Sequence, residues 1–116
     1  MAKTENKIVL EFQIIEDCPN VPQMLSNIHR AISGLEDKIN LIERIIYTPE
    51  IAAQIGFRGS PTLLINGEDL ENLPSPKQAS ISCRYYPNGI PSAKQIREKI
   101  EEKINEFKIN HSFTDN

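Results

Sequence analysis

The segment that most constrains the fold is a proline followed at once by a short apolar run and an Asn-Gly pair. Pro61 precedes residues 62–65 (Thr-Leu-Leu-Ile), and Asn66 and Gly67 follow them. Proline has no N–H to donate to a neighbouring strand, so within sheets it is confined to strand starts and edges. An Asn-Gly pair is the strongest short signal for a hairpin turn. The segment therefore predicts a strand over 62–65 that turns back into a brief antiparallel strand over 68–71.

Five other segments carry the periodicity of regular structure. They are strands over 8–15 and 39–47 and helices over 20–34, 49–55 and 93–107. Thr48 and Ser92 stand where helix N-caps are favoured, and Gly34 and Gly56 stand where helices end. Four prolines between residues 72 and 91 indicate a long irregular connection before the last helix.

The order of these elements is β-α-β-α-β-β-α, which indicates an α/β fold. The first two strands are joined through a helix and are expected to be parallel, whereas the last two form an antiparallel hairpin. A four-stranded mixed sheet with helices on both faces buries all the apolar faces. We expect a single domain over residues 1–116, with a core over about 8–107 and a frayed tail over about 108–116.

The charge and the apolar runs exclude several function classes. Lys and Arg number 13 against 16 Asp and Glu, a formal net charge of −3, and no basic stripe offers a footprint for nucleic acid. No apolar run approaches a membrane span, and the first residues lack the apolar region of a signal peptide. Two cysteines are too few for a disulfide scaffold or a four-thiolate zinc site. We expect a cytoplasmic protein with no nucleic-acid or membrane partner, no cofactor and no resident metal.

Cys18 lies directly after the first strand and at the start of the first helix. The unpaired amides and the dipole of a helix N-terminus favour a negative charge, which is what a thiolate carries. The carboxylates of Glu16 and Asp17 act in the opposite sense, because like charges disfavour a second anion. Position alone leaves two interpretations open: an activated nucleophile, or an inert cysteine packed at the end of a strand.

Residues 51–68 closely resemble the thioredoxin segment around its cis-proline. A short helix, a glycine, Gly-x-Pro-Thr, an apolar strand and an Asn-Gly turn follow one another in that order. Cys18 matches the nucleophilic cysteine of thioredoxins and glutaredoxins. The resemblance covers roughly residues 8–107 and implies a thioredoxin-like fold. It also implies that the Ser60–Pro61 bond is cis and lies beside Cys18, and that the Ser60 backbone pairs with an extended substrate.

One position departs from the thioredoxin pattern. Thioredoxins use Cys-x-x-Cys, whereas Val21 stands in place of the second cysteine, so this motif cannot form its own disulfide. The chain resembles single-cysteine variants of the fold, including monothiol glutaredoxins, although their Cys-Gly-Phe-Ser pattern is absent. Cys83 lies in the connection before the last helix, which in the thioredoxin fold is at the same end of the sheet as Cys18. Cys83 is therefore either a resolving thiol for Cys18 or an unrelated loop cysteine.

Two arginines flank the expected site. Arg58 and Arg84 could steady a thiolate or bind an anionic partner such as glutathione. His29 lies roughly three helical turns beyond Cys18 and is expected at the surface, which leaves few ligands for a metal. Two thiolates could still hold a soft ion such as mercury or copper(I).

Two hypotheses from different classes follow. In the first, the chain is a thiol–disulfide oxidoreductase that exchanges with protein or small-molecule thiols and disulfides. Cys18 is then the nucleophile and Cys83 the possible resolving thiol, while Ser60 and Pro61 orient the substrate. In the second, the chain is a non-catalytic binding module or a soft-metal thiol-binding protein. The missing second cysteine favours the second hypothesis, and the placement of Cys18 with the intact Gly-x-Pro-Thr segment favours the first.

Overall fold

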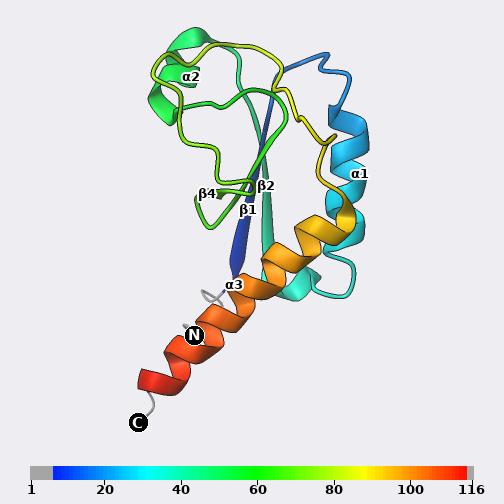
Figure 1. The fold of residues 1–116 in the computed structure, drawn as a ribbon, viewed down its shortest axis with the longest axis vertical. Coiled ribbons are helices and arrows are strands. Elements are labelled where there is room, and N and C mark those ends of the chain that lie inside the picture. The colour runs from blue at the N-terminus through cyan, green and yellow to red at the C-terminus, as the bar shows by residue number, and fades with distance from the viewer. Residues whose placement is uncertain (1–6, 115–116) are drawn as a thin grey trace.

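A computed structural model describes residues 7–114, and within this range four strands form one sheet in the order β2-β1-β3-β4 (Figure 1). The strands are β1 (Ile8–Ile14), β2 (Ile39–Ile45), β3 (Thr62–Ile65) and β4 (Glu68–Asp69). β1 runs parallel to β2 and antiparallel to β3, and β3 forms an antiparallel hairpin with β4. The mixed sheet that the sequence predicts is confirmed.

Helices connect the strands within the described residues. They are α1 (Val21–Ala31), the short 3-10 helix η2 (Glu36–Lys38), α2 (Pro49–Ile55) and α3 (Ala93–Thr114). The hydroxyl of Thr48 accepts a hydrogen bond from the N–H of Ile51 at 3.1 Å, and that of Ser92 accepts one from Gln95 at 3.1 Å. These side chains satisfy amides that have no partner within their own helix. Local sequence therefore determines where α2 and α3 begin.

The main core lies between one face of the sheet and helices α1 and α3. Side chains alternate along a strand, so Ile8, Leu10 and Phe12 of β1 share a face, and all three are buried. The helical residues that pack there are Met24 and Ile28 of α1 and Ile96 and Ile100 of α3. Each such side chain contributes roughly 1.5–3 kcal/mol by leaving water.

Helix α2 packs at one end of the sheet, on the side opposite the main core. A second, smaller cluster joins Ala52 of α2 to Ile46 and Phe57, with Ile15 packed against it. Ile15 follows β1 and alternates with the residues that face the main core. In Figure 1, α2 lies near the end of the sheet where β1 leads into α1. The helices thus lie on both faces, as the element order predicts.

Several element ends differ from the sequence prediction. α1 ends at Ala31 rather than at residue 34, because the chain turns before Gly34, whose φ is 86°. β2 ends two residues earlier than predicted. β4 is shorter than the strand predicted over 68–71, and Asn72, with a φ of 62°, turns the chain away from the sheet.

Helix α3 extends further than the sequence predicted. It continues to Thr114, beyond the end predicted at residue 107, while the frayed tail over about 108–116 stays a prediction. No Gly or Pro follows Pro91 to interrupt the helix. Residues 115–116 lie outside the described range. Neither α3 nor any other helix within residues 7–114 is long and apolar enough to cross a membrane.

Candidate active site

The two cysteines lie side by side although 65 positions separate them. Cys18 follows β1, and Cys83 lies in the irregular connection between β4 and α3. Their sulfur atoms are 3.6 Å apart, and both are free thiols. The topology explains this contact. β1 and β4 both end at the end of the sheet where β3 begins, and Cys18 follows β1 while Cys83 follows β4. The structure thus brings together the two cysteines that the sequence singled out.

A short stretch of backbone pairing holds Cys83 in place. The N–H of Ser60 donates to the carbonyl of Ser82 at 2.9 Å, and the N–H of Arg84 donates to the carbonyl of Ser60 at 2.8 Å. Ser60 and Cys83 therefore form an isolated parallel bridge. The segment Ser82–Arg84 lies along Ser60 as an extended chain, with Cys83 at its centre.

Ser60 and Pro61 form the wall of the site next to β3. Ser60 is fully buried, and its hydroxyl accepts a hydrogen bond from the N–H of Ile15 at 3.0 Å. The Ser60–Pro61 peptide bond is cis. The carbonyl of Pro61 accepts a hydrogen bond from the hydroxyl of Tyr86 at 2.6 Å. Ser60 is thus bonded to the residue that follows β1, and Pro61 is bonded to Tyr86 of the connection that carries Cys83.

Cys18 is buried, with 5% of its surface exposed. Its sulfur has two hydrogen-bond partners among the described residues, the carbonyl of Ser60 at 3.5 Å and the sulfur of Cys83. Helix α1 begins only at Val21, whose N–H donates to the Cys18 carbonyl at 3.2 Å. The nearest amide of the helix therefore binds the backbone of Cys18 rather than its sulfur.

Cys83 is the exposed sulfur of the pair. The pKa of its thiol is raised above the ordinary value, first by the hydrogen bond to Cys18, then by burial and by the charge that Cys18 would carry. A thiol that donates to a neighbouring sulfur loses that interaction on ionising, and two adjacent negative charges repel each other. Contact with Cys18 therefore disfavours the thiolate form of Cys83.

Arg84 contacts Asp69 rather than either sulfur. Its guanidinium is buried and donates two hydrogen bonds to Asp69 of β4, at 2.6 and 3.0 Å, and a third to Thr62 at 3.2 Å. It also stacks on the ring of Tyr86, 4.5 Å from the ring centre. The buried carboxylate of Asp69 thus pairs with the guanidinium, and Arg84 anchors the backbone next to Cys83.

Arg58 likewise contacts groups other than the two sulfurs. It donates to the carbonyl of Leu73 at 2.6 Å and lies 4.0 Å from the Asp69 carboxylate. Burial opposes ionisation of Asp69, but hydrogen bonds from Arg84 and from the N–H groups of Leu73 and Glu71 outweigh it. The pKa of Asp69 is therefore below its ordinary value, and the carboxylate stays charged.

Asp69, Tyr86 and Thr62 are the site residues that sequence reasoning missed. Asp69 belongs to a strand of two residues, which is too short for alternation to show which side chain faces inward. Tyr86 and Thr62 acquire their roles through partners more than 20 positions away, Pro61 and Arg84 respectively. Asp69 is flanked by Glu68 and Leu70, so its neighbours in the sequence give no signal of its burial either.

Gly59 gives the Cys83 segment room to approach. Its φ is +104°, and a Cβ atom there would lie 2.9 Å from the Cβ of Arg84. We expect Gly59→Ala to lower the free energy of unfolding by about 1–3 kcal/mol and to loosen the pairing of Ser60 with Arg84, measurable by urea titration. Gly34→Ala is the matched control, since Gly34 has a φ of +86° and no atom within 4 Å of the added Cβ. Equal losses in both variants would contradict a collision with Arg84.

Comparison with known proteins finds a solved structure with a similar fold. No protein-family model matches the sequence, and no curated protein matches it. Among solved structures, the chain is similar to chloroplastic thioredoxin z, with a TM-score of 0.58 at 10% sequence identity over 87% of this chain and 81% of that one. The chain has a thioredoxin-like fold. At this identity the similarity concerns the fold alone.

In this thioredoxin-like chain, the second cysteine does not lie in the helix that follows Cys18. Val21, at the position expected for a second cysteine, is the first residue of α1 and is partly buried against the main core. Cys83 instead brings a sulfur to Cys18 from the connection before α3. The two cysteines are therefore separated by 65 positions of the chain rather than by one turn of helix.

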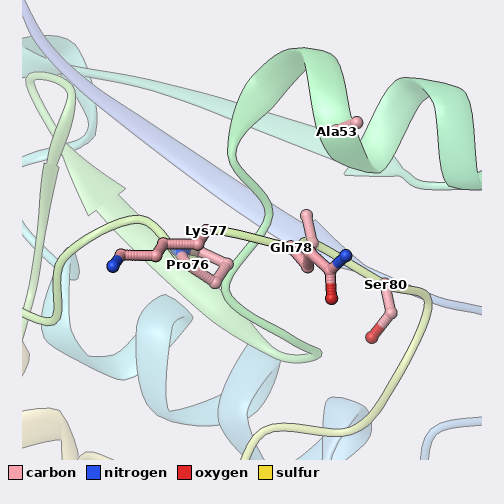
Figure 2. A pocket seen from close by; sticks show the side chains of 6 residues that line it. Ala53, Pro76, Lys77, Gln78 and Ser80 are labelled. Carbon is pink, nitrogen blue, oxygen red and sulfur yellow. The ribbon is translucent and has the colours of Figure 1, made fainter.

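A separate cavity of about 490 Å³ lies beside α2 (Figure 2). Its lining residues are Ala53, Pro76, Lys77, Gln78, Ala79 and Ser80. Neither cysteine lines it, and in Figure 2 the side chain of Lys77 extends away from that of Ser80. Within the described residues, no group of three or more His, Cys, Asp or Glu side chains is placed to hold a metal ion. Among the described residues, the candidate reactive groups are therefore the sulfurs of Cys18 and Cys83.

Proposed function

We propose that this chain is a thiol–disulfide oxidoreductase that works through a Cys18–Cys83 couple. The observation that carries the proposal is the 3.6 Å separation of the two sulfurs. Disulfide formation needs the two sulfurs to come to bonding distance, and from 3.6 Å this requires only a small shift of either side chain. The thioredoxin-like fold supports this assignment, because it places the pair at the end of the sheet beside a buried, ordered wall.

The proposed reaction moves two electrons and two protons between the couple and an external disulfide. One cysteine thiolate attacks a sulfur of that disulfide, whose S–S bond breaks, and the first external thiolate leaves. The other cysteine then attacks the sulfur of the first, forms the Cys18–Cys83 disulfide and releases the second external thiolate. The two cysteine protons end on the two released thiols. The sequence assigns the first attack to Cys18 and the second to Cys83.

The proposed partners are protein or small-molecule thiols and disulfides, such as glutathione, in a reducing cytosol. The exchange needs no cofactor, because the electrons pass between sulfur atoms. Ser60 and Pro61 remain the proposed surface for a partner chain. The backbone of Ser60 already pairs with Ser82 and Arg84, so that pairing has to open before a partner chain pairs there.

Binding of a soft metal ion by the same sulfurs is the second candidate. Two thiolates can hold copper(I) or mercury(II), which prefer soft ligands. The specific observation in its favour is that one sulfur, that of Cys18, is buried and its neighbour lies within 3.6 Å. Stoichiometric copper(I) binding that is lost in Cys83→Ser, without any disulfide turnover by the wild type, would favour this candidate.

A turnover assay tests the redox proposal. We expect the wild type to accelerate the reduction of 2-hydroxyethyl disulfide by glutathione, and Cys18→Ser and Cys83→Ser each to lower the rate on the order of 100-fold. The reason is that either replacement leaves the couple without one of its two sulfurs. Ser26→Ala, an exposed change on α1, is the control and should keep the wild-type rate. A single-cysteine variant that retained the wild-type rate would contradict a two-cysteine mechanism.

A further inference from the structure

The backbone edge next to Cys18 is already occupied by this chain. An extended peptide that docks beside a strand does so through main-chain hydrogen bonds. At Ser60 both main-chain groups are used, the N–H by Ser82 and the carbonyl by Arg84. The residue between those two partners is Cys83, whose sulfur contacts Cys18. Segment Ser82–Arg84 therefore lies at Ser60 as an internal strand that bears a cysteine.

The same segment leaves the two sulfurs with different access to solvent. Cys18 is 5% exposed, and its sulfur faces the carbonyl of Ser60 and the sulfur of Cys83. Cys83 is exposed. Thiol–disulfide exchange depends on access to the attacked sulfur. A molecule from solution therefore meets Cys83 first.

The segment is anchored on the side that follows Cys83. Arg84 donates twice to the buried carboxylate of Asp69 and once to Thr62. Tyr86 donates to the carbonyl of Pro61 at 2.6 Å. Buried, fully paired contacts of this kind resist local opening more than a bare loop does. They hold the segment over Cys18 in the structure.

We propose, on the basis of the redox function above, that small thiols enter the reaction at Cys83, and that segment Ser82–Arg84 restricts exchange to low-molecular-weight partners. In the oxidised form, an external thiolate attacks the sulfur of Cys83, the Cys18–Cys83 bond breaks, and Cys18 leaves as a thiolate. A second external thiolate then attacks the external sulfur of the mixed disulfide and releases Cys83. The products are the reduced couple and one small-molecule disulfide, so two electrons pass to the protein.

This order reverses the roles that the sequence assigned to the two cysteines. The reversal follows from access, because Cys83 is exposed and Cys18 is buried. The same path run backwards has Cys83 attack a small disulfide and Cys18 resolve it. A protein partner would need the Ser60 edge, which the chain's own segment fills.

Rates of reaction with 4,4′-dithiodipyridine, a small neutral disulfide, test the proposal. We expect Cys83 in Cys18→Ser to react at least about tenfold faster than Cys18 in Cys83→Ser, because only the first sulfur is exposed. Adding Tyr86→Phe or Arg84→Gln to Cys83→Ser should raise the rate of Cys18 about tenfold by loosening the segment. The same changes in Cys18→Ser should leave the rate of Cys83 within about twofold.

A trapping experiment separates this proposal from the redox function on which it rests. Oxidised wild type is mixed with glutathione, quenched with acid and mapped by peptide mass analysis. Glutathione on Cys83 supports the proposal. Glutathione on Cys18, or a Cys18 that reacts as fast as Cys83 in the single-cysteine variants, would overturn it while leaving the couple intact. Failure of the wild type to form any internal disulfide would instead overturn the redox function and this proposal with it.

Discussion

Replacing Asp69 by Asn is expected to lower the free energy of unfolding by about 3–5 kcal/mol, because it leaves the buried guanidinium of Arg84 without its counter-charge. The two groups are 2.6 Å apart, with side chains that are 5% and 1% exposed. Burying a charge is costly unless it is paired, so removing one partner costs more than the pair contributes. Urea titration of wild type and Asp69→Asn measures the difference.

An exposed ion pair supplies the matched control. Arg44 lies 2.7 Å from Glu11, but the Arg44 side chain is 47% exposed. Arg44→Gln is expected to cost no more than about 1 kcal/mol, because water solvates the charge left behind. Replacing Asp69 and Arg84 together by apolar residues should recover much of the loss. Equal costs for Asp69→Asn and Arg44→Gln would contradict the anchoring role of the buried pair.

The same carboxylate makes stability depend on pH. Because the pKa of Asp69 in the fold lies below its ordinary value of 3.8, the charged form is favoured by folding. Its contribution is fully present above pH 3.8 and is lost as pH falls through the lower value in the fold. Stability measured between pH 5 and 2 should therefore fall more steeply in wild type than in Asp69→Asn.

Oxidation of the wild type is expected to raise the free energy of unfolding by about 4 kcal/mol relative to the reduced protein. A bond between Cys18 and Cys83 would close a loop across 65 positions. Closing so long a loop removes many conformations from the unfolded chain, which is the source of the gain in the chain-entropy description. Paired urea titrations with and without a reductant measure it.

The single-cysteine variants are the controls for that gain. Cys18→Ser and Cys83→Ser should show the same stability under oxidising and reducing conditions, because neither can close the loop. A wild type whose stability does not change on oxidation, although the internal bond has formed, would show that strain in the oxidised form cancels the loop-closure gain.

The sequence was sufficient for the fold because its signals are local. Pro61 and the Asn66–Gly67 pair define β3 and its hairpin, and the alternation in β1 identifies the face that packs on α1 and α3. The approach of Cys83 to Cys18 was one of two alternatives, and the thioredoxin resemblance suggested it because that fold brings the two segments to one end of the sheet. These predictions depend on short-range chemistry and on connection rules.

The details that govern access to the site were beyond the sequence. The irregular connection before α3 is held by the buried ion pair between Asp69 and Arg84 and by the hydrogen bond from Tyr86 to Pro61, and these residues show no local signal for either contact. The sequence suggested that Arg84 could steady a thiolate or bind an anionic partner, whereas its guanidinium pairs with the buried carboxylate of Asp69. Occupation of the Ser60 edge by Ser82–Arg84 follows from that anchoring, so it too appears only in three dimensions.

Mass analysis of the mildly oxidised monomer tests the Cys18–Cys83 couple most directly. Wild type is predicted to lose two hydrogen atoms as a monomer and to yield one linked pair of peptides that contain Cys18 and Cys83. Each single Cys→Ser variant should keep its mass as a monomer under the same treatment. A wild type that forms only intermolecular disulfides or adducts at Cys18, with Cys83 still a thiol, would contradict the couple.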